Sequence, residues 1–287
     1  MSEPLDWPLL AARFCLLAAS IGLFGGACFD LYAPASVRSA GHLAVRLFLP
    51  LAATVAALAW IAALGREVEG AVGLPSRATI VQLCTQTGFG QALAAATLFG
   101  LALAGLALSP RRPGRLRACL SGGLLASLAF VGHAVGGPGG LPGAARIGVM
   151  AAHLLGAGVW LGGLLPLALA LPRAGTDTVP LLRGYGRIAM AAVALLVTSG
   201  MVVAFAVVML AGGALGGTYL ETFGLKLVLV SAMLVLASLN RWRLTPLAER
   251  DPAAARRAFA WTVAGEQVLA LAVIAAVTLL GQTDPSM

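Results

Sequence analysis

Eight long apolar runs constrain what this chain of 287 residues can fold into more than any other feature. The runs occupy residues 8–28, 43–64, 79–108, 116–136, 147–171, 186–211, 222–241 and 257–281. Each run approaches or exceeds the ~20 residues that a helix needs to cross the hydrocarbon core of a bilayer. Glycine and proline turns separate the runs, and no loop is long enough to be a further domain. We therefore predict one all-α domain over residues 1–287, a bundle of eight transmembrane helices.

The composition supports a polytopic membrane protein. Only 10% of the residues are charged and 60% are hydrophobic, whereas soluble domains carry roughly 25% charged residues. We expect the first run to remain as a helix, because Glu3 and Asp6 precede it and no A-x-A-like cleavage site occurs before Asp30.

The positions of the basic residues predict the orientation in the membrane. Fourteen of the nineteen lysines and arginines follow the first, third, fifth and seventh runs: Arg38, Arg46, Arg111, Arg112, Arg115, Arg117, Arg173, Arg183, Arg187, Arg241, Arg243, Arg250, Arg256 and Arg257. By the positive-inside rule these loops are cytoplasmic, so both termini are periplasmic. This placement leaves no soluble basic face for a phosphate backbone, and we expect no nucleic-acid partner despite the net charge of +8.

Two of the three histidines flank the glycine-rich turn between the fourth and fifth runs. If the fifth helix enters the membrane near Ile147, a rise of ~1.5 Å per residue places His153 roughly 10 Å inside the boundary. His133 approaches the same depth from the other side of the turn. An imidazole at that depth needs a partner, because unsatisfied polar groups in hydrocarbon are costly. One shared metal ion would satisfy both histidines.

The side chains near these histidines favour copper. Imidazole suits several transition metals, whereas thioether and thiolate ligands select Cu(I). Met150 shares a helical face with His153, Cys84 lies in the outer half of the third helix, and Cys15 is a second candidate in the first. We predict a copper site, for Cu(I) or Cu(II), whose metal ligands are His133, His153, Met150 and Cys84. Trp160 would lie below this site, deeper in the membrane, and limit the access of water. Two alternatives without a metal remain open: the methionine is a packing residue, and the cysteines are buried free thiols.

Three charged residues fall inside the predicted spans: Arg13, Lys226 and Glu266. A charge in hydrocarbon is costly, so each should face the bundle interior and find a partner there. The predicted orientation places Arg13 and Lys226 at the level of the histidines and Glu266 nearer the middle of the membrane. An interhelical ion pair and a role in an ion path are both open. Glu266 is the acidic candidate within the spans for proton coupling.

Motifs for nucleotide-driven or metalloprotease chemistry are missing from the sequence. It has no phosphate-binding loop ending in GKS or GKT, no HExxH and no DKTG. This excludes an ATP-driven pump, and we expect no enzymatic activity. The 36 glycines indicate close helix packing instead.

Several stretches in order along the chain carry a family resemblance. They are ARFCLLAASIGLFGG in the first run, TQTGFGQAL in the third, GHA at 132–134, HLLGAGVWLGGLLPL from His153, YGRIAMAAVALLVTSGM from Tyr185, ETFGLKLVLV around Lys226, and LNR at 239–241. With them the chain resembles the bacterial copper-resistance protein D (CopD/PcoD) family of inner-membrane proteins.

The resemblance implies a function in copper uptake, homeostasis or resistance. It implies copper binding at the periplasmic side through His133 and His153, with Trp160, Gly162 and Gly163 as framework and Lys226 as a polar feature within the membrane. It also implies a periplasmic copper-binding partner of the CopC type, which we expect to be a separate protein. Two alternatives stay open: a haem-binding electron carrier using the same histidines as axial ligands, and a structural or sensory membrane partner that transports nothing. The oligomeric state is open as well.

Overall fold

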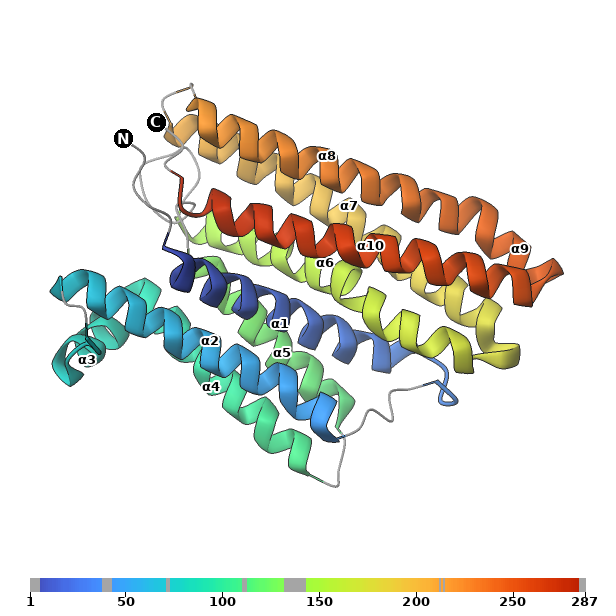
Figure 1. The fold of residues 1–287 in the computed structure, drawn as a ribbon, viewed down its shortest axis with the longest axis horizontal. Helices are drawn as coiled ribbons and strands as arrows, with labels where there is room; N and C mark the ends of the chain where they lie inside the picture. Colours follow the sequence, from blue (N-terminus) through green and yellow to red (C-terminus); the bar gives the residue numbers. More distant parts are fainter. Residues whose placement is uncertain are drawn as a thin grey trace.

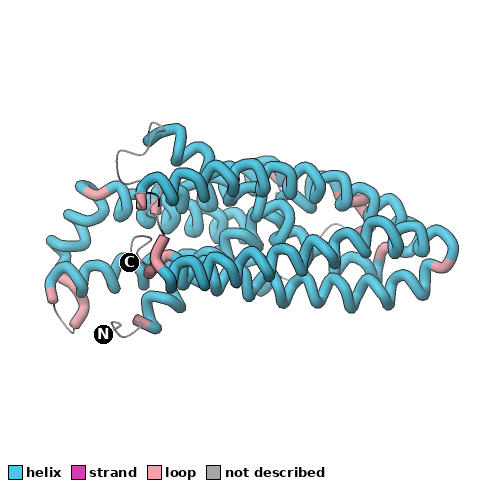
Figure 2. Tube along the Cα trace, turned by 90° about the horizontal axis from the view of Figure 1, so that it is seen from above, coloured by secondary structure: helices cyan, strands magenta, loops and turns pink. Residues whose placement is uncertain are grey.

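The computed structural model describes residues 6–37, 43–70, 73–109, 113–131, 143–211, 213 and 215–283. These residues form helices and turns, and no β-strand occurs among them (Figure 2). The long helices are α1 (Trp7–Tyr32), α2 (Leu43–Glu69), α4 (Gly88–Leu108), α6 (Gly143–Ala170), α7 (Thr178–Leu210), α8 (Gly217–Leu239) and α10 (Pro252–Leu280). Shorter elements are α3 (Arg77–Gln86), α5 (Gly114–Ser127), η1 (Leu128–Phe130), η3 (Leu171–Arg173), η4 (Gly175–Asp177), the π-helical η5 (Asn240–Leu244) and α9 (Thr245–Arg250). The predicted all-α membrane architecture is confirmed, with seven helices in the described residues long and apolar enough to span a bilayer.

The fourth predicted span differs from the sequence expectation. The run at 116–136 forms α5, a helix of 14 residues, and continues only as the 3-10 turn η1. At 1.5 Å per residue α5 is about 21 Å long, which is shorter than the ~30 Å hydrocarbon core. Residues 132–142 lie outside the described part of the chain, so the count of eight spans stays a prediction.

The third predicted span is two helices rather than one. Thr87 lies between α3 and α4 with an extended backbone, and it caps both of them. Its hydroxyl donates to the carbonyl oxygen of Leu83 (2.7 Å) and accepts from the backbone N–H of Gly90 (2.9 Å). A threonine that serves both helix ends in this way stops one helix and starts the next. The continuous helix predicted at 79–108 is therefore wrong at this position.

The bundle has two chemically different ends. At one end, which we call the terminal end, α1 begins and α10 ends (Figure 1). A Cβ atom on Gly281, just after α10, would lie 2.3 Å from Nη2 of Arg13 on α1, which shows how close these two ends are. The opposite end holds the described basic residues that the sequence predicts to be cytoplasmic, and we call it the arginine-rich end. The alternation of basic loops thus corresponds to one physical end of the bundle, and the side of the membrane it faces stays a prediction.

Helices α1 and α6 form the centre of the fold. Figure 1 shows them between α2, α3 and α4 on one flank and α7 and α8 on the other. Their backbones touch at glycines: a Cβ on Gly25 would lie 2.2 Å from the carbonyl carbon of Gly162 and 2.5 Å from the carbonyl oxygen of Gly158. Small residues allow such contact between membrane helices, where van der Waals packing drives association. The predicted role of the glycines in close packing is confirmed here, and α6 is held in a fixed register against α1.

Candidate functional site

His153 projects from α6 toward α7, where a serine holds its ring. The distance from Nδ1 of His153 to Oγ of Ser199 is 3.1 Å. The Ser199 hydroxyl in turn donates to the carbonyl oxygen of Leu195, four residues earlier in α7, at 2.5 Å. Because the serine proton is used in that bond, the serine oxygen accepts from Nδ1–H of the histidine. The neutral ring then carries its lone pair on Nε2, the form that a metal ion needs.

Two further residues define the surroundings of this ring. Gly200 on α7 lies against it, and a Cβ there would be 3.1 Å from Cε1 of His153. Lys226 on α8 places a positive charge in the same region, and this charge repels a protonated His153 ring. Three helices therefore contribute to one polar cluster inside the apolar part of the bundle. We call it the His153 cluster, and its members are His153, Ser199 and Lys226.

The predicted metal ligands are distributed unevenly. Met150 lies one turn from His153 on α6 and is half-buried. Cys84 lies in α3, which packs against α2 and α4 on the opposite flank of the bundle from α8 (Figure 1). Burial raises the pKa of the Cys84 thiol, so metal-binding thiolate is disfavoured there. Cys15 is exposed on α1.

His133, the second predicted ligand, lies outside the described residues, as does His42. Within the described part of the chain, no group of three or more His, Cys, Asp or Glu side chains is arranged to hold a metal ion. The structure therefore brings Met150 and His153 onto one helix and separates Cys84 from them. The complete ligand set stays a prediction.

Trp160, the residue predicted below the metal site, lies two turns from His153 along α6 and is only 3% exposed. Its main-chain carbonyl oxygen accepts a hydrogen bond from the hydroxyl of Tyr185 on α7, at 2.9 Å. Gly163 makes room for that tyrosine, since a Cβ on Gly163 would lie 2.9 Å from Cε2 of the ring. This contact joins α6 to α7 in the interior of the bundle.

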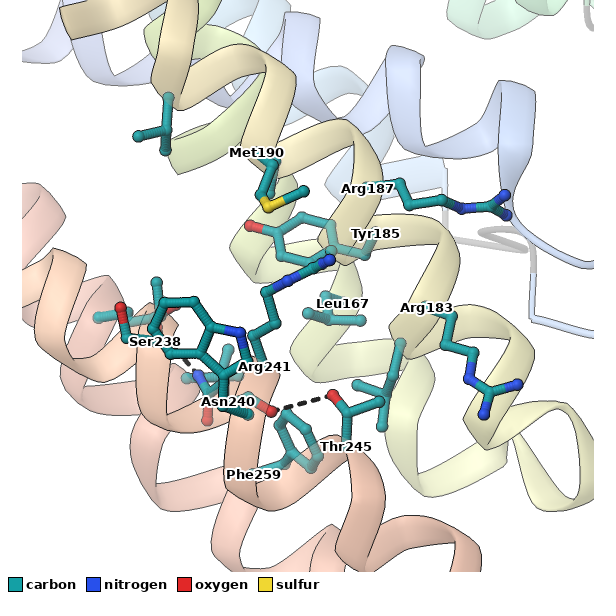
Figure 3. Close-up of a pocket in the computed structure, with 18 of the residues that line it drawn as sticks. Leu167, Arg183, Tyr185, Arg187, Met190, Ser238, Asn240, Arg241, Thr245 and Phe259 are labelled. Carbon is teal, nitrogen blue, oxygen red and sulfur yellow. Dashed lines mark hydrogen bonds between the residues drawn. The ribbon is translucent and has the colours of Figure 1, made fainter.

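A cavity of about 830 Å³ is lined by Trp160 and by residues nearer the arginine-rich end. Figure 3 shows side chains that line it. Its walls come from α6, α7, α8, η5, α9 and α10. The inner wall includes Trp160, Tyr185 and Glu266, and the mouth includes Arg183, Arg187, Arg241 and Glu249. Arg183 and Glu249 form an ion pair there. The cavity therefore reaches from the middle of the bundle to its basic end.

Glu266 lies at the inner end of this cavity and is 2% exposed. Its Oε1 accepts a hydrogen bond from Nδ2 of Asn240 (2.9 Å), and Oδ1 of Asn240 accepts from the hydroxyl of Thr262 (2.5 Å). Asn240 is the first residue of the π-helical turn η5, whose extra residue per turn shifts the side-chain positions after it. The turn is closed by a bond from the Thr245 hydroxyl to the Asn240 carbonyl oxygen, at 2.9 Å.

The three charged residues predicted inside the spans do not pair with one another in the described part of the chain. The Arg13 guanidinium lies over the ring of Trp60, 4.9 Å from its centroid. Glu266 bonds to Asn240, whereas the effect of the Lys226 charge on His153 is repulsive. Arg13 and Glu266 therefore find partners, which are aromatic and neutral polar groups, and a partner for Lys226 stays a prediction. The interpretation as an ion pair among these residues is therefore not supported.

Sequence reasoning missed four residues of these sites: Ser199, Tyr185, Asn240 and Thr262. Asn240 carried a signal, because it is the only asparagine in the sequence and stands at the end of an apolar run. An amide at such a position is expensive in hydrocarbon unless it is bonded inside the protein. Ser199, Tyr185 and Thr262 gave no comparable signal, since their roles depend on the register between neighbouring helices.

Comparisons with known proteins agree with the family resemblance. The family described as "Copper resistance protein D-like, N-terminal domain" matches residues 4–144, and the family described as "Copper resistance protein D" matches residues 179–280. A protein of Pseudomonas syringae pv. tomato named copper resistance protein D is 31% identical over 317 aligned residues, which cover 100% of this chain and 99% of the relative. No solved structure matches the chain.

Proposed function

Since the chain belongs to the copper resistance protein D family, we propose that it accepts copper at the periplasmic face through His153 and carries it across the membrane. The protein is a multi-pass protein of the bacterial inner membrane with a copper-related function. In this proposal copper is the cargo, and the protein is a carrier without enzymatic activity. A separate periplasmic copper-binding protein of the CopC type would deliver the ion.

The observation that carries the proposal is the 3.1 Å contact between Nδ1 of His153 and Oγ of Ser199. Because the serine hydroxyl donates to Leu195, its oxygen can accept a hydrogen bond from Nδ1–H, and this bond orients the ring and leaves the Nε2 lone pair for an ion. Outer-shell bonds of this kind fix the tautomer of metal-binding histidines in general. The same ring lies in a membrane-spanning helix, where a polar side chain marks a functional position by default.

Lys226 supports Cu(I) over Cu(II) as the species that binds. The lysine interacts electrostatically with His153 from α8. The repulsion between its ammonium and an arriving ion grows in proportion to the charge of that ion. A monovalent ion is therefore repelled half as strongly as a divalent one. A thioether ligand favours the same oxidation state, and Met150 on the same helix supplies one.

His133 completes the proposed periplasmic site as the second imidazole. Cys84 does not belong to this proposal, because α3 packs on the other flank of the bundle. Met150 is therefore the soft ligand.

The proposed path runs along α6 from the His153 cluster to the cavity. Trp160 is seven residues beyond His153, which is about 10 Å along the helix axis, and it lines the inner wall of the cavity. Tyr185 and Glu266 face the same space. The arginine-rich end, which we propose to be cytoplasmic, is where the cavity ends. An ion that leaves His153 thus meets a second polar region on the same side of the bundle.

Copper binding by the purified protein tests the site. The full chain in detergent is loaded with Cu(I) under reducing conditions, and bound copper is measured by mass spectrometry after desalting. We expect His153→Ala to lose the bound copper. We expect Ser199→Ala to weaken binding by about 10- to 100-fold, as is usual when the bond that orients a ligand is removed.

The matched control is Thr198→Ala, the neighbour of Ser199 on α7. Thr198 is exposed and its hydroxyl bonds only to carbonyl oxygens of its own helix among the described residues. Copper binding should be unchanged in this variant. An undiminished copper content in a His133→Ala, His153→Ala double variant that still elutes as a single species would refute the site.

Transport is tested separately in proteoliposomes with a Cu(I) indicator trapped inside. We expect flux that depends on the protein and is lost in His153→Ala. Copper binding without any flux would instead favour the non-transporting structural or sensory role. The haem alternative receives no support from the family comparisons, and a purified protein without a haem absorption band would remove it.

A further inference from the structure

Glu266 occupies an unusual position for a carboxyl group. It lies in the middle of α10, fourteen residues from either end of a helix that is 29 residues long. Its side chain is almost completely buried, yet it borders the cavity that reaches the arginine-rich end. No described lysine or arginine forms an ion pair with it. A carboxyl group placed in this way cannot be explained as one half of a structural salt bridge.

The hydrogen bonds around Glu266 hold the group but do not neutralise it. One carboxyl oxygen accepts from the Asn240 amide, and the Thr262 hydroxyl holds that amide from the same helix as Glu266. Both partners are neutral. Low-dielectric surroundings penalise a charged group unless a counter-charge or several hydrogen bonds compensate. A proton on the carboxyl removes that penalty without any rearrangement of the helices.

The cavity supplies a route for the proton. Its volume of about 830 Å³ is many times the ~30 Å³ share of one water molecule in the liquid, and polar side chains from α7, α8, η5, α9 and α10 are among its lining residues. The titratable or charged side chains that face it are Tyr185, Arg183 and Arg187 from α7, Arg241 from η5 and Glu249 from α9. Among the described residues, α1 and η3, which also pack against α10, contribute no lining residue. Water in this space can connect Glu266 to the arginine-rich side.

From this geometry we infer that Glu266 is a proton-exchange site, which takes up and releases a proton through the cavity on the arginine-rich side. Asn240 is a positioning residue, because its amide donates a hydrogen bond to one carboxyl oxygen of Glu266, a lining residue of the cavity. The exchange balances simply: the O–H bond of the carboxyl breaks, the proton passes to water in the cavity, and the carboxylate remains bonded to Asn240. The inference does not depend on the copper site and applies to the copper-free protein.

Infrared spectroscopy of the copper-free protein in liposomes tests the inference. A protonated carboxyl group absorbs at a frequency clear of the amide bands, and the band disappears on ionisation. We expect one such band to vanish reversibly as the pH rises and to be missing in Glu266→Gln. Asn240→Ala should retain the band but move it to higher frequency, because the carbonyl oxygen loses a hydrogen bond.

The control is Glu249→Gln, which removes a carboxyl group at the mouth of the same cavity but not at its inner end. Its spectrum should keep the Glu266 band. If wild type and Glu266→Gln show the same carboxyl bands at every pH at which both are folded, the inference is wrong. If the wild type shows the expected band and Asn240→Ala shows it at the same frequency, Asn240 is not a positioning residue.

Access from the arginine-rich side is tested with cysteines in a cysteine-free background. Ser238 on α8 lines the cavity, whereas Ser231 on the same helix is exposed on the outer surface. We expect Ser238→Cys to react with a charged thiol reagent applied from the arginine-rich side, and Ser231→Cys to be protected by lipid. A Ser238→Cys variant that reacts from neither side would refute the water-filled route.

Discussion

The hydroxyl of Tyr185 on α7 donates a hydrogen bond to the main-chain carbonyl oxygen of Trp160 on α6, at 2.9 Å. This bond lies between the two polar regions of the bundle, the His153 cluster on one side and the cavity with Glu266 on the other. Gly163 permits it, because any side chain there would meet the tyrosine ring. The separation of the two regions therefore depends on the α6–α7 contact at this level.

Removal of the Tyr185 hydroxyl should have a modest and measurable effect. Tyr185→Phe keeps the buried ring and loses one neutral hydrogen bond, which contributes about 0.5–1.5 kcal/mol to the free energy of unfolding. We expect a slightly lower melting temperature of the detergent-solubilised protein. Tyr219→Phe is the control, because that hydroxyl has no hydrogen bond to another described residue and its ring stacks on Phe223. Equal melting temperatures in the two variants would contradict the role of the bond.

A methyl group at Gly162 should disrupt the centre of the fold. A Cβ there would lie 2.0 Å from the carbonyl oxygen of Ile21 on α1, a distance that only backbone movement can relieve. We expect Gly162→Ala to destabilise the protein by about 1–3 kcal/mol, as overpacking does. Gly148→Ala on the same helix meets nothing within 4 Å and should be neutral or stabilising by up to about 1 kcal/mol. Similar thermal unfolding of both variants would show that α1 and α6 are less closely packed.

Lys226 should control which copper ion binds. A fixed positive charge near the site adds about 1–4 kcal/mol of repulsion for each further unit charge at close range. We therefore expect Lys226→Met to raise the affinity for Cu(II) relative to Cu(I) by about tenfold or more, and Lys226→Arg to keep the wild-type ratio. Competition with calibrated chelators for each oxidation state measures both affinities. An unchanged ratio in Lys226→Met would show that the ammonium lies too far from the ion to matter.

The orientation in the membrane is open to direct measurement. In a variant without the native cysteines, a single cysteine at Ser2 or Ser286 should react with an impermeant reagent in spheroplasts. A cysteine at Ala253, at the start of α10 and at the arginine-rich end, should react only after the membrane is permeabilised. The opposite pattern would invert the proposed direction of copper movement, although the two polar regions would remain as described.

Local properties of the sequence predicted most of the architecture. Length and hydropathy act within one segment, so seven of the eight predicted spans appear as long helices without knowledge of their neighbours. The break at Thr87 was missed because the polar residues around it, Thr85 and Gln86 before it and Gln91 after it, were included in one continuous span. The pattern of a threonine followed by glycines at positions 88 and 90 is nevertheless a local cap signal, and it could have divided the run.

The candidate sites were less predictable because they depend on register between helices. His153 stands out in the sequence as a rare polar residue, and the structure gives it a partner in Ser199, one of many similar hydroxyl residues. Glu266 was visible in the same way, but its partner Asn240 is 26 residues away and is aimed by a π-helical turn. The periodicity of one helix does not determine which residues of the neighbouring helix its side chains contact. The scarcity of polar residues in the spans singled out His153 and Glu266, and only the packing of the helices showed which residues they contact.

The contact between Gly25 and Gly162 also determines the order in which the protein can be assembled. Helix α1 is synthesised before α6, and Gly25 precedes its contact residue Gly162 by 137 residues. At about 5–20 residues per second, synthesis of that interval takes roughly 7–27 s. During this time α6 does not yet cover the glycine face of α1, and of the later helices only α2, α3, α4 and α5 have been made. Biogenesis must therefore hold an unfinished half-bundle in the membrane until α6 arrives, and a slow stretch of translation before residue 162 would prolong that vulnerable state.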